Sequence, residues 1–266
     1  MPARDGFELQ DGDVALIYHA FQLRVATIDH FAALSGRSVR ALWSRLAKLK
    51  ERRYLASVAR ITQKHVYSIG SQGVLVLIEH GYAPADLASR RLRSHEAREI
   101  GIRHSLFVAD IHTRILLLTR AKPIALSQWI EGPSLWDTAA GNGRDATIPV
   151  RPDSYFVLKQ LGLPEGKNTV HVFLEADRSS MAHTRMAAKI QGYLSYYEHR
   201  HYAKKYPNMK SFTVATVTQT RSRAEELRRD LHPLIPHGAR AAYLFIPFED
   251  LTLASLVPKA APLPLP

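Results

Sequence analysis

The first third of the chain has apolar residues at helical spacing, followed by a stretch in which apolar and polar residues alternate. The expected elements are helices at residues 13–24, 27–36 and 38–53, a hairpin at 54–70 and a further helix at 71–81. Asp13 and Thr27 are suitable N-caps for the first two helices, because their side-chain oxygens can accept a hydrogen bond from a backbone N–H. Gly36 is a suitable end for the second helix.

The third predicted helix and its flanks are strongly basic. Residues 37–53 contain seven basic residues and one acid, Glu51. Three short helices followed by a basic hairpin are typical of a winged helix-turn-helix domain, so we predict a domain of this kind over residues 1–81 that binds double-stranded DNA. The predicted DNA contacts are Arg37, Ser38, Arg40, Arg45, Lys48 and Arg52, with Lys64 close to the hairpin tip. Two alternatives stay open, because a basic helix face is often merely solvated and a winged helix can bind protein instead.

The second part of the chain alternates between helical segments and short apolar strands. The expected elements are a helix at 104–120, strands at 127–132, 148–158 and 169–177, a helix at 180–204, a strand at 211–219, a helix at 222–234 and a strand at 241–248. This αβββαβαβ order predicts a mixed α/β domain over residues 104–250. An arginine-rich connector at 82–103 precedes it, and a proline-rich tail at 251–266 follows it.

Composition narrows the class of partner. The net charge of +12 and the pI near 10.0 favour nucleic acid, because Lys and Arg release counterions from a phosphate backbone. The 266 residues include no cysteine, which excludes disulfides, a catalytic thiol and a cysteine-based zinc site. The most apolar runs are far shorter than the roughly 20 residues needed to cross a bilayer, and no N-terminal run resembles a signal peptide. We therefore expect a cytoplasmic protein with no membrane segment.

Three carboxylates are predicted to gather on one face of the sheet. The period of two along the strand at residues 169–177 puts Glu175 and Asp177 on the same face. Asp153 begins the preceding strand, and the loop between the strands folds them into a hairpin, so its carboxylate can meet Glu175. Hard divalent cations prefer clustered oxygen ligands, so we predict a Mg²⁺ or Mn²⁺ site at Asp153 and Glu175.

The element order and the literal Pro152-Asp153 resemble the restriction-endonuclease-like PD-(D/E)XK superfamily. This chain has Asp177 where the superfamily's lysine stands, two residues after the second acid. Members with a lysine moved onto the next helix are known, and here Lys189 is the candidate. It lies in a helical stripe with Arg185, Tyr193 and Tyr196. The resemblance implies catalytic roles for Asp153, Glu175, Asp177 and Lys189, and DNA contacts for Arg185 and Tyr193.

More narrowly, the predicted winged helix together with PDS, FLEADR and KIQGYLSYY resembles the replication-relaxation family of plasmid and mobile-element proteins. That family is related to the MobC-type plasmid relaxases. The resemblance covers roughly residues 11 to 248 and includes His104 and Glu131, whose roles it leaves open. It implies a metal-dependent endonuclease or nickase that acts on plasmid or mobile-element DNA. A further expected partner is a second copy of the chain, in a homo-oligomer, or another replication or mobilisation protein.

Purely structural roles for the same residues are the alternative interpretation. Asp153 at a strand start can be a turn former, and Asp177 at a strand end can cap the next helix. Tyr193, Tyr196 and Tyr197 recur at the spacing of packing residues, and the chain contains neither a His-Glu-x-x-His zinc motif nor a phosphate-binding GxxxxGK loop. The competing function is a non-catalytic DNA-binding accessory protein with a degenerate nuclease fold, because a fold does not by itself confer an activity.

Overall fold

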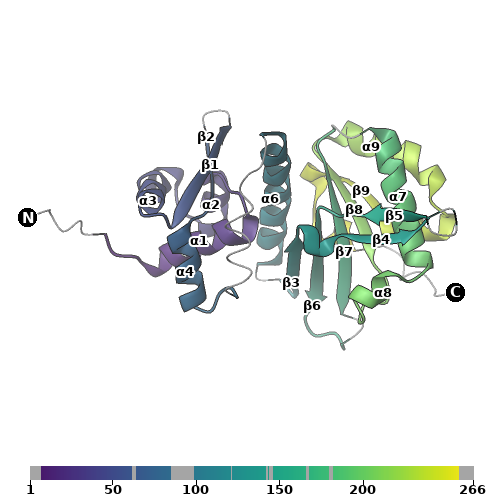
Figure 1. Ribbon diagram of the computed structural model, residues 1–266, viewed down its shortest axis with the longest axis horizontal. Helices are drawn as coiled ribbons and strands as arrows, with labels where there is room; N and C mark the ends of the chain where they lie inside the picture. The colour runs from purple at the N-terminus through teal and green to yellow at the C-terminus, as the bar shows by residue number, and fades with distance from the viewer. Residues whose placement is uncertain are drawn as a thin grey trace, which may run out of the picture. The chain divides into compact units, whose positions relative to one another are not determined.

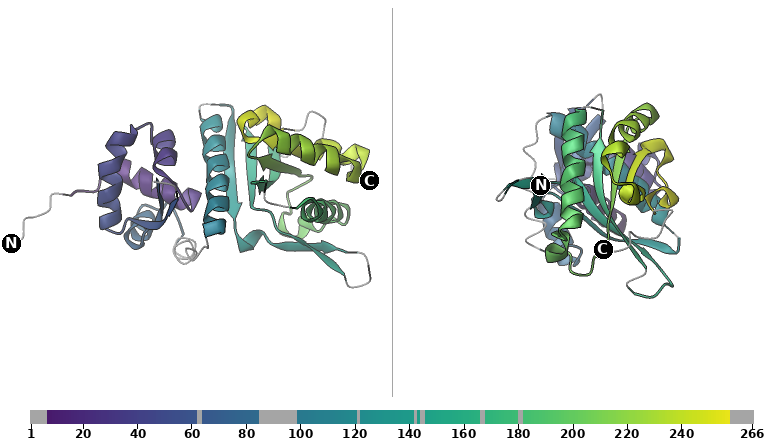
Figure 2. Two further views of the ribbon diagram at one scale, coloured as in Figure 1. Left: turned by 90° about the horizontal axis from the view of Figure 1, so that it is seen from above. Right: turned by 90° about the vertical axis from the view of Figure 1, so that its right-hand side faces the viewer.

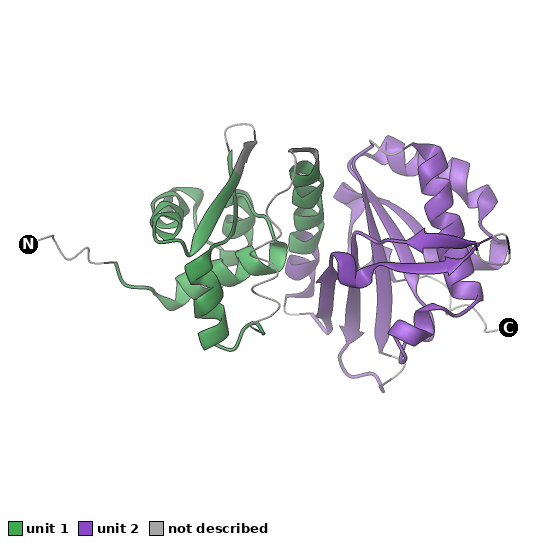
Figure 3. Cartoon of the chain, in the orientation of Figure 1, with its two compact units in different colours: residues 1–113 green, residues 114–266 purple. Residues whose placement is uncertain are grey.

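The computed structural model describes residues 7–61, 64–84, 99–120, 122–141, 143, 146–165, 168–179 and 182–257. The chain divides into two compact units, residues 1–113 and 114–266 (Figure 3). The division falls inside helix α6, Glu99–Thr119, so this helix contributes residues to both units. Most of the predicted connector, residues 85–98, lies outside the described residues.

The first unit consists of short helices and a two-stranded antiparallel hairpin (Figure 1). Its elements are α1 Asp11–Leu23, α2 Ile28–Ser35, α3 Val39–Glu51, β1 Leu55–Ile61, β2 Lys64–Ile69 and α4 Ser71–Glu79. Leu16, Phe31 and Leu46 are fully buried, one from each of the first three helices. The predicted order of three helices, a hairpin and a further helix is confirmed, with small shifts at the ends.

Helix ends in this unit agree with the sequence at α2 but not at α1. Thr27 is the N-cap of α2, and Gly36 is its C-cap with a left-handed φ of 70°. The predicted cap Asp13 is wrong, because α1 starts at Asp11 with Gln10 as its N-cap. Asp13 lies inside the first turn, where its carboxylate accepts a hydrogen bond from the Gln10 N–H at 2.8 Å.

The second unit is built on a five-stranded mixed sheet in the order β3-β6-β7-β8-β9. These strands are β3 Ile124–Glu131, β6 Ser154–Gln160, β7 Thr169–Asp177, β8 Thr213–Thr218 and β9 Tyr243–Pro247. The first three are antiparallel neighbours, and β8 and β9 continue the sheet in parallel with β7. The helices are the shared α6, then α7 His183–Glu198, α8 Tyr202–Lys205, α9 Arg221–Leu231 and α10 Leu253–Leu256. Within the described residues, no helix is both long enough and apolar enough to span a bilayer.

Two predicted elements are divided in the structure. The strand expected at residues 148–158 becomes β5 Thr147–Val150 and β6, because β5 pairs with β4 Asp137–Ala140 in a separate two-stranded sheet. Pro152, which lacks an amide donor, lies in the connection. The helix expected at 180–204 ends at Glu198 and restarts as α8, and Arg200 between them has a φ of 52°.

The end of the described chain is packed more closely than a proline-rich tail predicts. Leu251 and Leu256 are fully buried, and α10 lies within the segment predicted as a proline-rich tail. Thr252 caps this short helix by accepting a hydrogen bond from the Ser255 N–H at 3.1 Å. Residues 258–266 lie outside the described part of the chain.

Helices α7 and α9 cover one face of the five-stranded sheet (Figure 2). Tyr155 of β6 and Phe173 of β7 belong to the same buried cluster as Met186 of α7 and Leu227 of α9. Because side chains alternate along a strand, the odd-numbered residues that follow Phe173 on β7 face these helices as well. The fold therefore presents the end of β7 to both α7 and α9.

Candidate functional site

Asp153 and Glu175 lie close together at one end of the β6–β7 pair. The last registered pair of the two strands is Ser154 with Leu174, and Asp153 directly precedes β6. The Asp153 N–H donates to the Leu174 carbonyl at 3.0 Å, and the Asp153 Oδ2 accepts from the Ala176 N–H at 2.8 Å. The charge of Asp153 contributes to raising the pKa of Glu175, so the two carboxylates are near each other. The structure therefore brings the two predicted metal ligands together.

Glu175 is a buried carboxylate with two partners on α7. Its side chain is 2% exposed, Oε2 accepts a hydrogen bond from Lys189 Nζ, and Oε1 accepts one from the Tyr193 hydroxyl at 2.7 Å. Burial raises the pKa of Glu175 to about 7 because desolvation outweighs the charge of Lys189, and the nearby Asp153 carboxylate raises it as well. Glu175 can therefore change its charge near neutral pH.

Lys189 reaches the sheet from the middle of α7. Its side chain is 22% exposed, and Nζ also donates to the Arg151 carbonyl at 3.3 Å. Burial acts to lower the pKa of Lys189, but the carboxylates of Glu175 and Asp153 outweigh burial and leave the pKa raised. Lys189 is therefore a permanent positive charge beside Glu175.

The tyrosines of α7 are packing and hydrogen-bonding residues in this structure. Tyr193 is fully buried, and burial together with Glu175 raises the pKa of its hydroxyl well above the ordinary value. The Tyr196 hydroxyl donates to Asp137 Oδ2 at 2.7 Å, and Tyr197 is half-buried against Phe212. A neutral, buried hydroxyl is a poor nucleophile, and Tyr193, one of the predicted DNA contacts, instead orients Glu175.

Asp177 shares the face of Glu175 but points to α9. Its Oδ2 accepts from Arg223 Nε at 2.7 Å, and its Oδ1 accepts from the Ser179 N–H at 3.0 Å. Both side chains of the ion pair are buried, Asp177 at 1% and Arg223 at 9% exposed. The resemblance implies a catalytic role for Asp177, and the alternative interpretation is a cap for the next helix. The structure places its carboxylate in a buried pair that joins the end of β7 to α9.

A second group of polar side chains joins α7 to α9. His183 Nε2 lies 2.8 Å from Glu226 Oε1, and His183 Nδ1 lies 2.9 Å from Asp230 Oδ2. One ligand atom from each of the three residues lies within 4.8 Å of the others, which is a spacing that can hold a metal ion. However, the carboxylates contact opposite nitrogens of one ring, and the Arg223 guanidinium lies 2.6 Å from Nε2. We therefore interpret the group, which the sequence analysis missed, as a junction between the helices.

In the first unit, the predicted DNA contacts fall into two groups. Arg40 and Lys48 are exposed on α3, and Ser38 is the N-cap of this helix, accepting from the Ala41 N–H at 3.2 Å. Arg45 instead forms an ion pair with the fully buried Asp13, where Arg45 Nε donates to Oδ1 at 2.6 Å. The sequence analysis missed this pair, because nothing in the spacing of the two residues marks them as neighbours.

The other predicted contacts of this unit also have neighbours within the chain. The Arg52 guanidinium lies 4.5 Å from the centre of the Phe7 ring. Lys64 Nζ is in an ion pair with Asp29 Oδ2 at 2.5 Å, with both side chains more than half exposed. Arg37 is half-buried, and its charge contributes to lowering the pKa of Asp13, after the larger effects of burial, which opposes the shift, and of Arg45. Among the predicted contacts, Arg40 and Lys48 are the exposed cations on α3.

Arg185, Glu131 and His104 are the remaining predicted residues. Arg185 is exposed on α7, one turn before Lys189. Glu131 ends β3, where its Oε1 accepts from Trp129 Nε1 at 2.6 Å. His104 is half-buried on α6.

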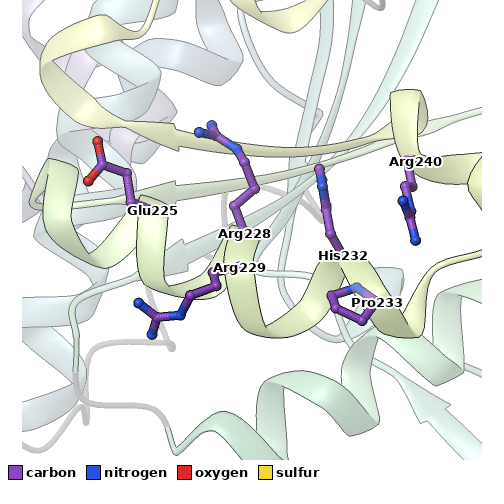
Figure 4. Close-up of a pocket in the computed structure, with 6 residues that line it drawn as sticks. All are labelled: Glu225, Arg228, Arg229, His232, Pro233 and Arg240. Carbon is purple, nitrogen blue, oxygen red and sulfur yellow. The ribbon is translucent and has the colours of Figure 1, made fainter.

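A basic pocket lies at the C-terminal end of α9 (Figure 4). It has a volume of about 420 Å³ and is lined by Glu225, Arg228, Arg229, His232, Pro233 and Arg240. Burial, together with the charges of Arg228 and Arg240, lowers the pKa of His232. The side chains of Arg228 and Arg229 leave the helix in opposite directions, so their guanidinium groups do not converge. The pocket adds positive charge to this unit but shares no residue with the site around Glu175.

The family of the chain follows from comparison with known proteins. Comparisons with curated proteins and with solved structures give no match. The model of the family described as replication-relaxation matches residues 19–211, which cover most of the first unit and the segment that carries Asp153, Glu175 and Lys189. Because the match extends over well more than half of the 266 residues, the chain belongs to the replication-relaxation family, whose name implies a DNA-related activity.

Proposed function

We propose that this protein is a metal-dependent DNA endonuclease or nickase that acts in the replication or mobilisation of plasmid or mobile-element DNA. In this proposal the first unit is a winged helix-turn-helix that binds duplex DNA, and the second is a PD-(D/E)XK-like nuclease. The observation that carries the proposal is the buried Glu175, which contacts Lys189 and lies close enough to Asp153 for the charge of Asp153 to raise its pKa. Membership of the replication-relaxation family supports the DNA-related part.

The donor set at Glu175 fits a divalent cation. Asp153 and Glu175 both offer hard oxygen ligands, and Mg²⁺ is commonly bound by one or two carboxylates. The Asp153 charge contributes to raising the pKa of Glu175, after burial, and a cation between the acids relieves this repulsion. Asp153 and Glu175 would therefore hold Mg²⁺ or Mn²⁺, which lowers the pKa of a bound water and neutralises charge at a scissile phosphate.

The neighbouring side chains have separate tasks in this proposal. Lys189 stays positive and supplies a fixed charge to the phosphoryl oxygens, whose negative charge is stabilised during cleavage. Tyr193 holds Glu175 in place through the hydrogen bond from its hydroxyl. Arg185, exposed one turn before Lys189, contacts the DNA backbone. Asp177 does not contact the cation in this proposal, and its ion pair with Arg223 holds the end of β7 against α9.

A non-catalytic accessory protein is the second candidate function, and one observation favours it. Asp177 stands at the position where the PD-(D/E)XK pattern has its lysine, and it is committed to Arg223. The lysine function therefore depends wholly on Lys189, which contacts Glu175 directly. If Lys189 does not serve the phosphate, the second unit is a scaffold for DNA binding.

Incubation with supercoiled plasmid tests the proposal. The full chain is expected to convert supercoiled plasmid to the nicked form in Mn²⁺ but not in EDTA. Asp153→Asn, which keeps the shape of the side chain and removes its charge, is expected to abolish nicking while DNA binding is retained. Absence of nicking by the unmodified chain in both Mg²⁺ and Mn²⁺, over a range of plasmid sequences, supports the accessory protein instead.

A further inference from the structure

An exposed tryptophan lies in the second unit, directly before β4. The side chain of Trp136 is 50% exposed, although its backbone is firmly held. The Trp136 N–H donates to the Pro133 carbonyl at 3.1 Å, and its own carbonyl accepts from Lys205 Nζ at 3.1 Å. The next residue, Asp137, accepts a hydrogen bond from the buried Tyr196. The indole ring is therefore exposed even though hydrogen bonds hold the backbone of Trp136 in place. The exposed ring leaves a large apolar surface in contact with water.

The tryptophan is joined to the site through Arg151. The Arg151 guanidinium lies 4.9 Å from the centre of the Trp136 ring, a cation–π contact on the protein surface. The Arg151 carbonyl accepts a hydrogen bond from Lys189 Nζ at 3.3 Å, and Arg151 is two residues before Asp153. The backbone of Arg151 thus contacts Lys189 and precedes Asp153, while its side chain contacts the Trp136 ring.

We infer that Trp136 and Arg151 form a stacking platform for an unpaired DNA base beside the Asp153–Glu175 site. Aromatic rings and arginine planes stack on bases of any sequence, and in nucleic-acid-binding proteins they recur in positively charged grooves that hold single strands. A paired base inside a duplex hides its faces between its neighbours, so an exposed ring selects a base that is already unstacked. The inferred substrate is therefore single-stranded DNA, or duplex DNA that is opened beside the scissile phosphate. This inference rests on the proposed function for the identity of the adjacent site.

The test is a binding titration in EDTA with the full chain, so that no cleavage is required. Fluorescence anisotropy is measured with a labelled single-stranded oligonucleotide and with a duplex of the same sequence. Trp136→Ala is expected to weaken single-strand binding roughly 5- to 100-fold and to leave duplex binding nearly unchanged. Trp136→Phe is expected to retain most of the single-strand affinity, because the smaller ring still stacks.

A matched control and a folding measurement separate the platform from a structural role. Leu161→Ala removes another exposed apolar side chain, 55% exposed after the end of β6, and is expected to change neither affinity. Thermal unfolding of each variant shows whether the fold is intact. An equal loss in Trp136→Ala and Trp136→Phe, or an equal loss for single strand and duplex, overturns the platform.

The outcome is distinguishable from failure of the proposed function. A selective loss of single-strand affinity in Trp136→Ala, in a protein that nicks no plasmid with any metal, leaves the platform standing and removes the nuclease. Metal-dependent nicking together with unchanged single-strand affinity in Trp136→Ala leaves the nuclease standing and removes the platform.

Discussion

Glu175 and Asp177 are two acids on one strand face with different partners. The period of two predicted their shared face, and the structure confirms it. Their partners, Lys189 and Arg223, come from two helices whose relative placement depends on how each packs on the sheet. A single sequence contains no local signal for that placement. Lys189 was predicted from its position on the helix after the strand, whereas Arg223 was not predicted at all.

The raised pKa of Glu175 predicts a measurable effect of pH on stability. Its pKa shifts from the ordinary 4.5 to about 7 on folding, so between these values the folded chain binds more protons than the unfolded chain. The stability contributed by this group is full below pH 4.5 and is lost as pH rises through 7, by up to about 3 kcal/mol. Urea unfolding in EDTA should therefore show the free-energy difference between Glu175→Gln and the unmodified chain changing in favour of the variant from pH 5 to pH 8. A constant difference over that range contradicts the raised pKa.

The two acids also predict where a cation binds. Titration calorimetry with Mn²⁺ should give heats of binding for the unmodified chain and none for the double substitution Asp153→Ala, Glu175→Ala, because both predicted ligands are removed. Asp177→Asn is the matched control, since this carboxylate lies on the same strand but is paired with Arg223. Equal heats for the double variant and the unmodified chain place any cation elsewhere.

At the scale of elements, the order of helices and strands was predictable and their breaks were not. The pattern predicted the β6–β7 hairpin, which brings Asp153, directly before β6, near Glu175. The pattern predicted β5 and β6 as one strand, because an apolar run does not show which strand it pairs with. In the structure β5 pairs with β4. The pattern also did not predict the ion pair between the buried Asp13 of α1 and Arg45 of α3.

The ion pair between Asp13 of α1 and Arg45 of α3 gives a prediction about the stability of the first unit. Asp13 is fully buried, and although burial acts to raise its pKa, the hydrogen bond from Arg45 leaves the pKa lowered. Arg45→Ala removes the ion-pair partner of this buried carboxylate, leaves only the smaller effect of the Arg37 charge, and should reduce the free energy of unfolding by about 3–5 kcal/mol. Lys48→Ala, on the exposed face of the same helix, should change it by less than about 0.5 kcal/mol. Urea denaturation of the two variants provides the comparison, and equal effects speak against a structural role for Arg45.

At the scale of the whole molecule, a net charge of +12 predicts binding that depends strongly on salt. Arg40 and Lys48 are exposed on α3 and are suited to phosphate contacts without a structural cost. Each phosphate contact contributes about 0.9 to the slope of log affinity against log salt on duplex DNA. The substitution Arg40→Ala, Lys48→Ala should therefore lower the magnitude of the slope by roughly 2, measured by anisotropy at several salt concentrations. An unchanged slope in a folded variant removes α3 from the DNA interface.

The most direct test of the account is the rate of plasmid nicking by Lys189→Met. Lys189 replaces the strand lysine of the nuclease pattern in this account, and methionine keeps much of its length while removing the charge. A variant that folds and binds DNA and Mn²⁺ like the unmodified chain should nick supercoiled plasmid roughly 100- to 1,000-fold more slowly, because a fixed charge at the reacting phosphate is lost. Nicking by that variant at the unmodified rate contradicts the assignment of Lys189.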